Sequence, residues 1–153
     1  MAEKRIVFVC TGNVCRSPMA EYLLRARLGA DSEWTVSSAG LAAGVGMTAS
    51  LPAVRVLAEE GIDLTPHRSR PLDRSLVDAA TIIVVMTAAH RRQMAFGFPD
   101  AMERVFLLGS FGPGRGDVPD PIGLADEAYD RIRDLISEAL PDLLSFLETL
   151  DVR

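Results

Sequence analysis

The chain has 153 residues, 48% hydrophobic and 24% charged, which suits a single folded domain, residues 1–153, with one buried core. Its formal net charge of -5, without a basic patch interleaved with aromatic residues, argues against nucleic-acid binding and against attachment to an anionic membrane. The longest apolar run, around residues 79–85, is far below the roughly 20 residues that span a bilayer. The N-terminal apolar run is too short for a secretory signal, so we expect a cytoplasmic location.

The spacing of apolar residues predicts strands that alternate with helices. Strands are expected at about residues 5–9, 34–37, 81–86 and 104–107, and helices at about 17–29, 48–60, 72–78, 88–96 and 124–149. This alternation predicts an α/β fold, a three-layer sandwich whose parallel sheet of four strands is covered by helices on both faces. Ligands of such sheets bind at the carboxyl ends of the strands, where Cys10, Ser38 and Thr87 are expected to converge. Pro141 is expected to kink or break the last helix.

Residues 10–18 read Cys-Thr-Gly-Asn-Val-Cys-Arg-Ser-Pro and join the first expected strand to the first expected helix. Ser17 is a natural N-cap, with a proline at the first helical position. The backbone N–H groups of such a loop and the positive end of the helix form a cradle for a tetrahedral oxyanion. The same field favours a nucleophilic thiolate at Cys10, and the planar guanidinium of Arg16 can hold two phosphoryl oxygens. The segment therefore predicts a site that handles phosphate.

Two other residues of this segment carry structural expectations. Asn13 tolerates the left-handed backbone that an inward-curling loop demands. Cys15 either captures a sulfenic acid formed on Cys10 or packs as an inert buried thiol, and the spacing does not decide between the two. Both cysteines of the chain lie in this loop, which suits a reducing compartment and offers no convincing zinc site.

Residues 109–123 are rich in glycine and proline and precede a long amphipathic helix, so they form a loop that can carry an acid over the site. The loop holds Asp117 and Asp120. A carboxylic acid there can protonate the leaving group and afterwards activate water against a phosphocysteine. The residues alone do not choose between the two aspartates, because either can simply cap a turn.

Neither of the two histidines, His67 and His90, has a serine or cysteine nearby in the sequence at a spacing that indicates a catalytic pair. This disfavours a cysteine protease arrangement. We expect His67 to be a structural histidine and His90, beside Arg91 and Arg92, to be solvated.

The segment 10–18 resembles the signature of the low-molecular-weight protein tyrosine phosphatases, and the resemblance extends over nearly the whole chain. The residues Ser38-Ala39-Gly40, His67, Met86-Thr87 and Asp120-Pro121 follow in the order and spacing of that family. The resemblance implies a flavodoxin-like sheet of order 2-1-3-4 and hydrolysis of a phosphorylated protein or peptide through a phosphocysteine intermediate. It further implies a monomer that needs neither cofactor nor metal.

The resemblance also implies a role for each matching residue. Cys10 is the nucleophile, Arg16 the phosphate clamp, Ser17 the stabiliser of the thiolate and Asp120 the general acid. The phosphate-binding residues are Thr11, Gly12, Asn13, Val14, Cys15 and Arg16, and the residues that support their loop are Asn13, Ser38 and His67. Reversible inactivation by oxidation of Cys10, with Cys15 as its partner, is implied as well.

The sequence departs from the tyrosine-specific members of that family at two places. Asp120-Pro121 is followed by Ile122-Gly123, and the segment after Ser38 contains no aromatic ring that could stack on a phenyl group. Together with Thr11 behind the nucleophile, this looks like the protein-arginine phosphatase branch, so Thr11 and Ile122 are candidate specificity residues. Phosphotyrosine and phosphoarginine both remain open as substrates.

Other functions share parts of this pattern. A thiol-dependent arsenate reductase uses a similar oxyanion loop, but its electron relay needs cysteines downstream, and none follows Cys15. A noncatalytic phosphate-binding module is disfavoured because nucleophile, clamp and acid are all present. A phosphatase that acts on a small phosphoester remains open.

Overall fold

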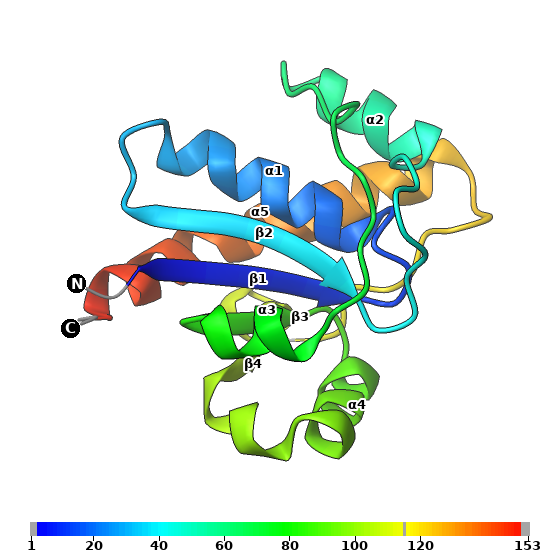
Figure 1. Ribbon diagram of the computed structural model, residues 1–153. Helices are drawn as coiled ribbons and strands as arrows, with labels where there is room; N and C mark the ends of the chain where they lie inside the picture. Colours follow the sequence, from blue (N-terminus) through cyan, green and yellow to red (C-terminus); the bar gives the residue numbers. More distant parts are fainter. Residues whose placement is uncertain (1–2, 115, 151–153) are drawn as a thin grey trace.

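The computed structural model describes residues 3–114 and 116–150, which fold into a parallel sheet with helices on both faces (Figure 1). The four strands are β1 (Lys4–Cys10), β2 (Trp34–Gly40), β3 (Ile82–Val85) and β4 (Val105–Leu107), in the order β2-β1-β3-β4. The helices are α1 (Arg16–Leu28), α2 (Leu51–Ala58), α3 (Arg74–Ala79), α4 (Ala88–Gly97) and α5 (Asp126–Thr149), with 3-10 turns η1 (Pro99–Arg104) and η2 (Leu108–Phe111). The predicted fold class and strand order are confirmed.

Two apolar layers lie on opposite faces of the sheet. Ile6 and Phe8 of β1 pack in the layer formed with α1, α2 and α5, whereas Val7 and Val9 pack in the layer formed with α3 and α4. Successive side chains of a strand alternate between the two faces, so a strand covered on both sides needs apolar residues at every position. This explains the unbroken apolar run of β1, and the helices of both layers are visible above and below the sheet in Figure 1.

Two local expectations are wrong. Helix α1 begins at Arg16 with Cys15 at the N-cap, so Ser17 lies inside the first turn and its hydroxyl faces Cys10 instead of capping the helix. Pro141 does not break the last helix: α5 continues through it, and fully buried leucines on either side, Leu140 and Leu143, hold both halves against the core. Among the helices of the described chain, none is both long and apolar enough to cross a membrane.

The loop after β1 passes closely over the end of β2. Cys10 pairs with Gly40 in the sheet, and the next peptide carbonyl, that of Thr11, lies against the same glycine. A Cβ added at Gly40 would lie 2.4 Å from the Thr11 carbonyl oxygen and 2.7 Å from Ala43 Cβ. The loop can therefore take its observed path only because position 40 has no side chain.

We expect Gly40→Ala to lower the free energy of unfolding by about 1–3 kcal/mol, the usual cost of forcing extra atoms into a filled site. Urea unfolding of the two proteins measures the difference. Gly97→Ala is the matched control, because a Cβ there meets no atom within 4 Å and alanine is favoured over glycine in a helix. An unchanged unfolding midpoint for Gly40→Ala would contradict the close approach.

Candidate active site

Cys10 ends β1, and the following residues curl back to the start of α1; we call residues 10–17 the cysteine loop. The Cys10 thiol is buried, and its Sγ lies 2.9 Å from the Ser17 Oγ. The Ser17 oxygen accepts a hydrogen bond of 2.8 Å from the side-chain amide of Asn13. The hydroxyl hydrogen of Ser17 is thereby left to donate to the sulfur, where it stabilises negative charge. The structure thus brings Cys10 and Ser17 together as predicted.

Asn13 holds the cysteine loop in its curled form. Its φ of 58° lies in the left-handed region, which asparagine tolerates better than most residues. Its buried amide nitrogen also donates to Ser38 Oγ at 2.9 Å, and its amide oxygen accepts the backbone N–H of Arg70 at 3.0 Å. Its carbonyl oxygen lies 2.8 Å from His67 Nε2. Ser38 and His67, predicted with Asn13 to support the loop, therefore both contact Asn13.

Glu21 extends this network into α1. It is buried, accepts a hydrogen bond of 2.6 Å from Ser38 Oγ and forms an ion pair with Arg25 one helical turn later. Arg25 in turn donates to the carbonyl oxygen of Val36. Sequence reasoning did not single out Glu21, because a glutamate four residues before an arginine is usually a solvated helix pair. Hydrogen-bond donation runs in one direction, from Asn13 through Ser38 to Glu21.

Arg16 links the cysteine loop to residues 117–123, which we call the Asp120 loop. Its guanidinium is buried, donates to the carbonyl oxygen of Val118 at 3.1 Å and lies 3.7 Å from Asp120 Oδ2. The N–H of Val118 donates to the carbonyl oxygen of Met86, which ties the Asp120 loop to the end of β3. The predicted clamp and the predicted acid are thus neighbours.

The two aspartates of the Asp120 loop have different environments. The Asp120 side chain is 47% exposed, and its other oxygen, Oδ1, accepts the N–H of Ile122 at 3.0 Å. Asp117 instead accepts the N–H of Ala88 at 2.9 Å and so caps the start of α4. Because Asp120 is the one near Arg16, the geometry favours it over Asp117 as the acid.

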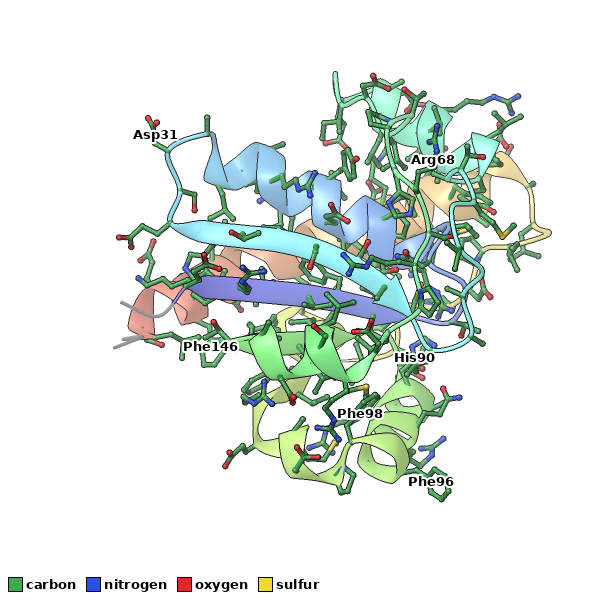
Figure 2. All side chains as sticks on the ribbon, in the orientation of Figure 1. Asp31, Arg68, His90, Phe96, Phe98 and Phe146 are labelled. Atoms are coloured by element: carbon green, nitrogen blue, oxygen red, sulfur yellow. The ribbon has the colours of Figure 1, made fainter. Side chains whose placement is uncertain are left out.

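The expectation that His90 is solvated is wrong. Its side chain is 3% exposed, and its Nε2 lies 2.9 Å from Thr11 Oγ1. Helical spacing explains the difference, since His90 and Met94 share the inner face of α4 while Arg91 and Arg92 are exposed. In Figure 2, His90 lies beside the carboxyl ends of the strands, whereas Phe96 points away from the molecule. Thr11 is thereby joined to α4.

Burial changes the titration of His90. Desolvation, and then the positive charge of Arg16, lower the pKa of His90 to about 4, although Asp117 and Asp120 act in the opposite direction. The ring is therefore neutral at physiological pH. Its Nδ1 is buried and has no hydrogen-bond partner among the residues that the structure describes.

Cys15 lies on the inner side of the cysteine loop as a buried thiol. It donates to Ser50 Oγ at 3.3 Å and lies 3.5 Å from the hydroxyl of Tyr129. Burial raises the pKa of the Cys15 thiol and raises the pKa of Tyr129 to about 12. Cys10 and Cys15 are both free thiols. Capture of an oxidised Cys10 by Cys15 stays a prediction.

The remaining predicted residues lie around this centre. Thr11 and Ile122 are exposed, Gly12 and Val14 are half-buried, and the carbonyl oxygen of Val14 accepts the N–H of Ser50. Within residues 3–114 and 116–150, no three His, Cys, Asp or Glu side chains are grouped so as to hold a metal ion.

Comparison with known proteins identifies the family and the fold. Residues 5–152 match the family described as low molecular weight phosphotyrosine protein phosphatase. A protein-arginine-phosphatase of Geobacillus stearothermophilus is 41% identical over 146 residues, covering 95% of this chain and 97% of the relative. A probable low molecular weight protein-tyrosine-phosphatase, EpsP of Ralstonia solanacearum, is 43% identical over 118 residues, covering 77% and 78%. The solved YwlE arginine phosphatase from Geobacillus stearothermophilus superposes with a TM-score of 0.87 at 40% identity, covering 95% and 94%.

Acid should destabilise the protein through His90. The ordinary histidine pKa is about 6.5, and the pKa of His90 in the folded chain is about 4. At pH values between the two, the unfolded chain binds a proton at residue 90 and the folded chain does not. The free energy of unfolding therefore falls as the pH falls. From pH 7 to pH 5 we expect the wild type to lose about 2 kcal/mol more than His90→Gln, whose side chain does not titrate. Urea unfolding at the two pH values measures this, and equal losses would contradict the burial of a neutral ring.

Proposed function

The chain belongs to the low molecular weight phosphotyrosine protein phosphatase family and is a protein phosphatase, and we propose that it hydrolyses phosphoarginine in proteins. The observation that carries this choice of substrate is the Asp120 loop, which places the Asp120 carboxylate 3.7 Å from Arg16, carries a second carboxylate at Asp117 and contains no aromatic ring. The phosphorylated residue would be attacked by Cys10.

The proposed reaction has two steps. The Cys10 thiolate attacks phosphorus, so that an S–P bond forms while the P–N bond to the arginine side chain breaks, and Asp120 gives its proton to the leaving nitrogen. Asp120 then takes a proton from water, and the water oxygen attacks phosphorus as the S–P bond breaks, which releases phosphate and restores the thiolate. Arg16 holds phosphoryl oxygens in both steps, and the Ser17 hydroxyl, 2.9 Å from the sulfur, stabilises the departing thiolate.

Charge at the site supports a guanidinium leaving group. Asp117 and Asp120 lie on the same loop and attract a planar cation, and the neutral ring of His90 adds no positive charge beside them. A phenyl leaving group would gain about 0.5–1.5 kcal/mol from an aromatic neighbour, but neither residues 39–50 nor residues 117–125 contain one. The protein-arginine-phosphatase of Geobacillus stearothermophilus, similar over 95% of this chain, also supports the proposal.

Phosphotyrosine is the second candidate substrate. The exposed apolar side chains of Ile122 and Leu124, 58% and 59% exposed, can contact a phenyl ring without stacking on it. The similarity to the tyrosine phosphatase EpsP favours this alternative.

The proposal includes a monomer in a reducing, cytoplasmic compartment. Cys10, Arg16 and Asp120 come from one chain, so a second copy is not needed to complete the site. The two free thiols of the cysteine loop suit a reducing environment.

Substrate choice can be measured on one peptide that carries either phosphoarginine or phosphotyrosine. We expect kcat/KM for phosphoarginine to be higher by at least about tenfold, because a difference of about 1.4 kcal/mol in transition-state binding has that effect. Cys10→Ser is the blank and should show no turnover. A preference for phosphotyrosine would overturn the proposal in favour of the second candidate, and inactivity on both peptides would point to small phosphoesters or arsenate.

The acid role of Asp120 predicts a dependence on the leaving group. Asp120→Asn should lower kcat/KM for phenyl phosphate by about 10²–10³-fold, but should lower kcat/KM much less for p-nitrophenyl phosphate, whose leaving group departs without a proton. Asp117→Asn is the matched control, because its amide oxygen can still accept the Ala88 N–H. Equal slowing of both substrates by Asp120→Asn would count against the acid role.

A further inference from the structure

The first turn of α4 contacts both loops of the active site. Its backbone N–H at Ala88 donates to Asp117 of the Asp120 loop at 2.9 Å, and its His90 side chain lies 2.9 Å from Thr11 of the cysteine loop. The side chain of Thr87 accepts the backbone N–H of His90 at 3.1 Å and fixes this turn. One helical turn therefore spans the distance between the residue after the nucleophile and the loop of the acid.

The position of the proton on His90 follows from its surroundings. A neutral imidazole carries hydrogen on one nitrogen and offers a lone pair on the other. Because Nδ1 is buried without a partner in the described part of the chain, a hydrogen there would be an orphaned donor, which is rarer and more costly than an orphaned lone pair. The hydrogen is therefore on Nε2 and is donated to Thr11 Oγ1. The charged groups that face this ring are Arg16, Asp117 and Asp120.

Packing alone does not account for a histidine at this position. A leucine would fill similar space on the inner face of α4, as Met94 does one turn later, and would leave no polar nitrogen buried without a partner. What the histidine adds is the directed hydrogen bond to Thr11.

We propose that His90 is a positioning residue. Through its hydrogen bond to Thr11, His90 holds the cysteine loop against the first turn of α4. The same turn holds the Asp120 loop through Asp117, so the two loops keep a fixed separation. The inference rests on the proposed roles of Cys10 and Asp120. Its consequence concerns proton transfer: the acid reaches the leaving group only while the two loops keep their spacing. Phosphate binding depends on Arg16 and the backbone of the cysteine loop, so it should be affected less.

Three variants isolate the hydrogen bond. His90→Leu removes the donor and keeps the bulk, His90→Gln keeps an N–H donor at the end of the side chain, and Thr11→Val removes the acceptor. Met94→Leu, on the same face of α4, is the control for packing. We would measure kcat and KM for phenyl phosphate and p-nitrophenyl phosphate, the inhibition constant of inorganic phosphate, and the thermal unfolding midpoint of each protein.

His90→Leu and Thr11→Val should lower kcat/KM for phenyl phosphate by about tenfold or more, since small misplacements of catalytic groups have such effects. His90→Leu should change kcat/KM for p-nitrophenyl phosphate and the inhibition constant of phosphate by less than about threefold. His90→Gln should recover most of the lost activity. The double variant, His90→Leu with Thr11→Val, should be no slower than either single variant, because both remove the same bond.

Equal slowing of both substrates, or wild-type kinetics in His90→Leu, would overturn the proposal. The same slowing in Met94→Leu would also overturn it, because packing would then explain the effect. If His90→Leu fails to fold, Thr11→Val and His90→Gln decide the question with the same two substrates. Failure of the proposed function is recognised separately: the wild type would then be inactive, or Asp120→Asn would show no dependence on the leaving group.

Discussion

The left-handed backbone of Asn13 is the constraint on which the rest of the site depends. A residue other than glycine pays about 1–2 kcal/mol for this conformation, and buried hydrogen bonds from several elements must offset it. Ser17 belongs to α1, Ser38 to β2, and His67 and Arg70 to the segment before α3. The loop is therefore shaped by tertiary structure, and it becomes a binding site only once the sheet and both flanking segments are in place.

The same network sets the electrostatics around the sulfur. Because donation runs from Asn13 through Ser38 to Glu21, the negative end of the chain of hydrogen bonds lies on α1, away from Cys10. The negative charge of Glu21 is compensated by the ion pair with Arg25. The Arg25 side chain is about half exposed, so water still solvates the cation that pairs with the buried carboxylate. Near Cys10 the network presents a hydroxyl hydrogen. In an interior of low polarity such an oriented donor stabilises an anion more strongly than it would in water.

The sequence was sufficient for the fold, and it singled out residues that the structure brings together at the end of β1, because both follow from local patterns. Apolar runs without alternation indicated buried parallel strands, and the short segment 10–18 contained nucleophile, clamp and loop residues together. The errors concern distant contacts. The burial of His90 depends on which face of α4 meets the sheet, and its arginine neighbours gave the opposite impression. Ser17 was predicted to be a helix cap, but its hydroxyl instead contacts Cys10, and the buried hydrogen bond of Glu21 to Ser38 was not predicted at all.

The arrangement also lowers the repulsion between the proposed nucleophile and the proposed acid. In the second proposed step the departing Cys10 thiolate and the Asp120 carboxylate lie near one phosphoryl group, and their negative charges repel each other. Arg16 lies 3.7 Å from Asp120 and extends from the helix turn that follows Cys10, so its charge lowers this repulsion while its remaining N–H groups are available to the phosphoryl oxygens. A guanidinium that bridges the two loops can serve both purposes because it is planar and has five donors. A protonated His90 beside it would have competed for Asp120, and burial prevents this by keeping the ring neutral.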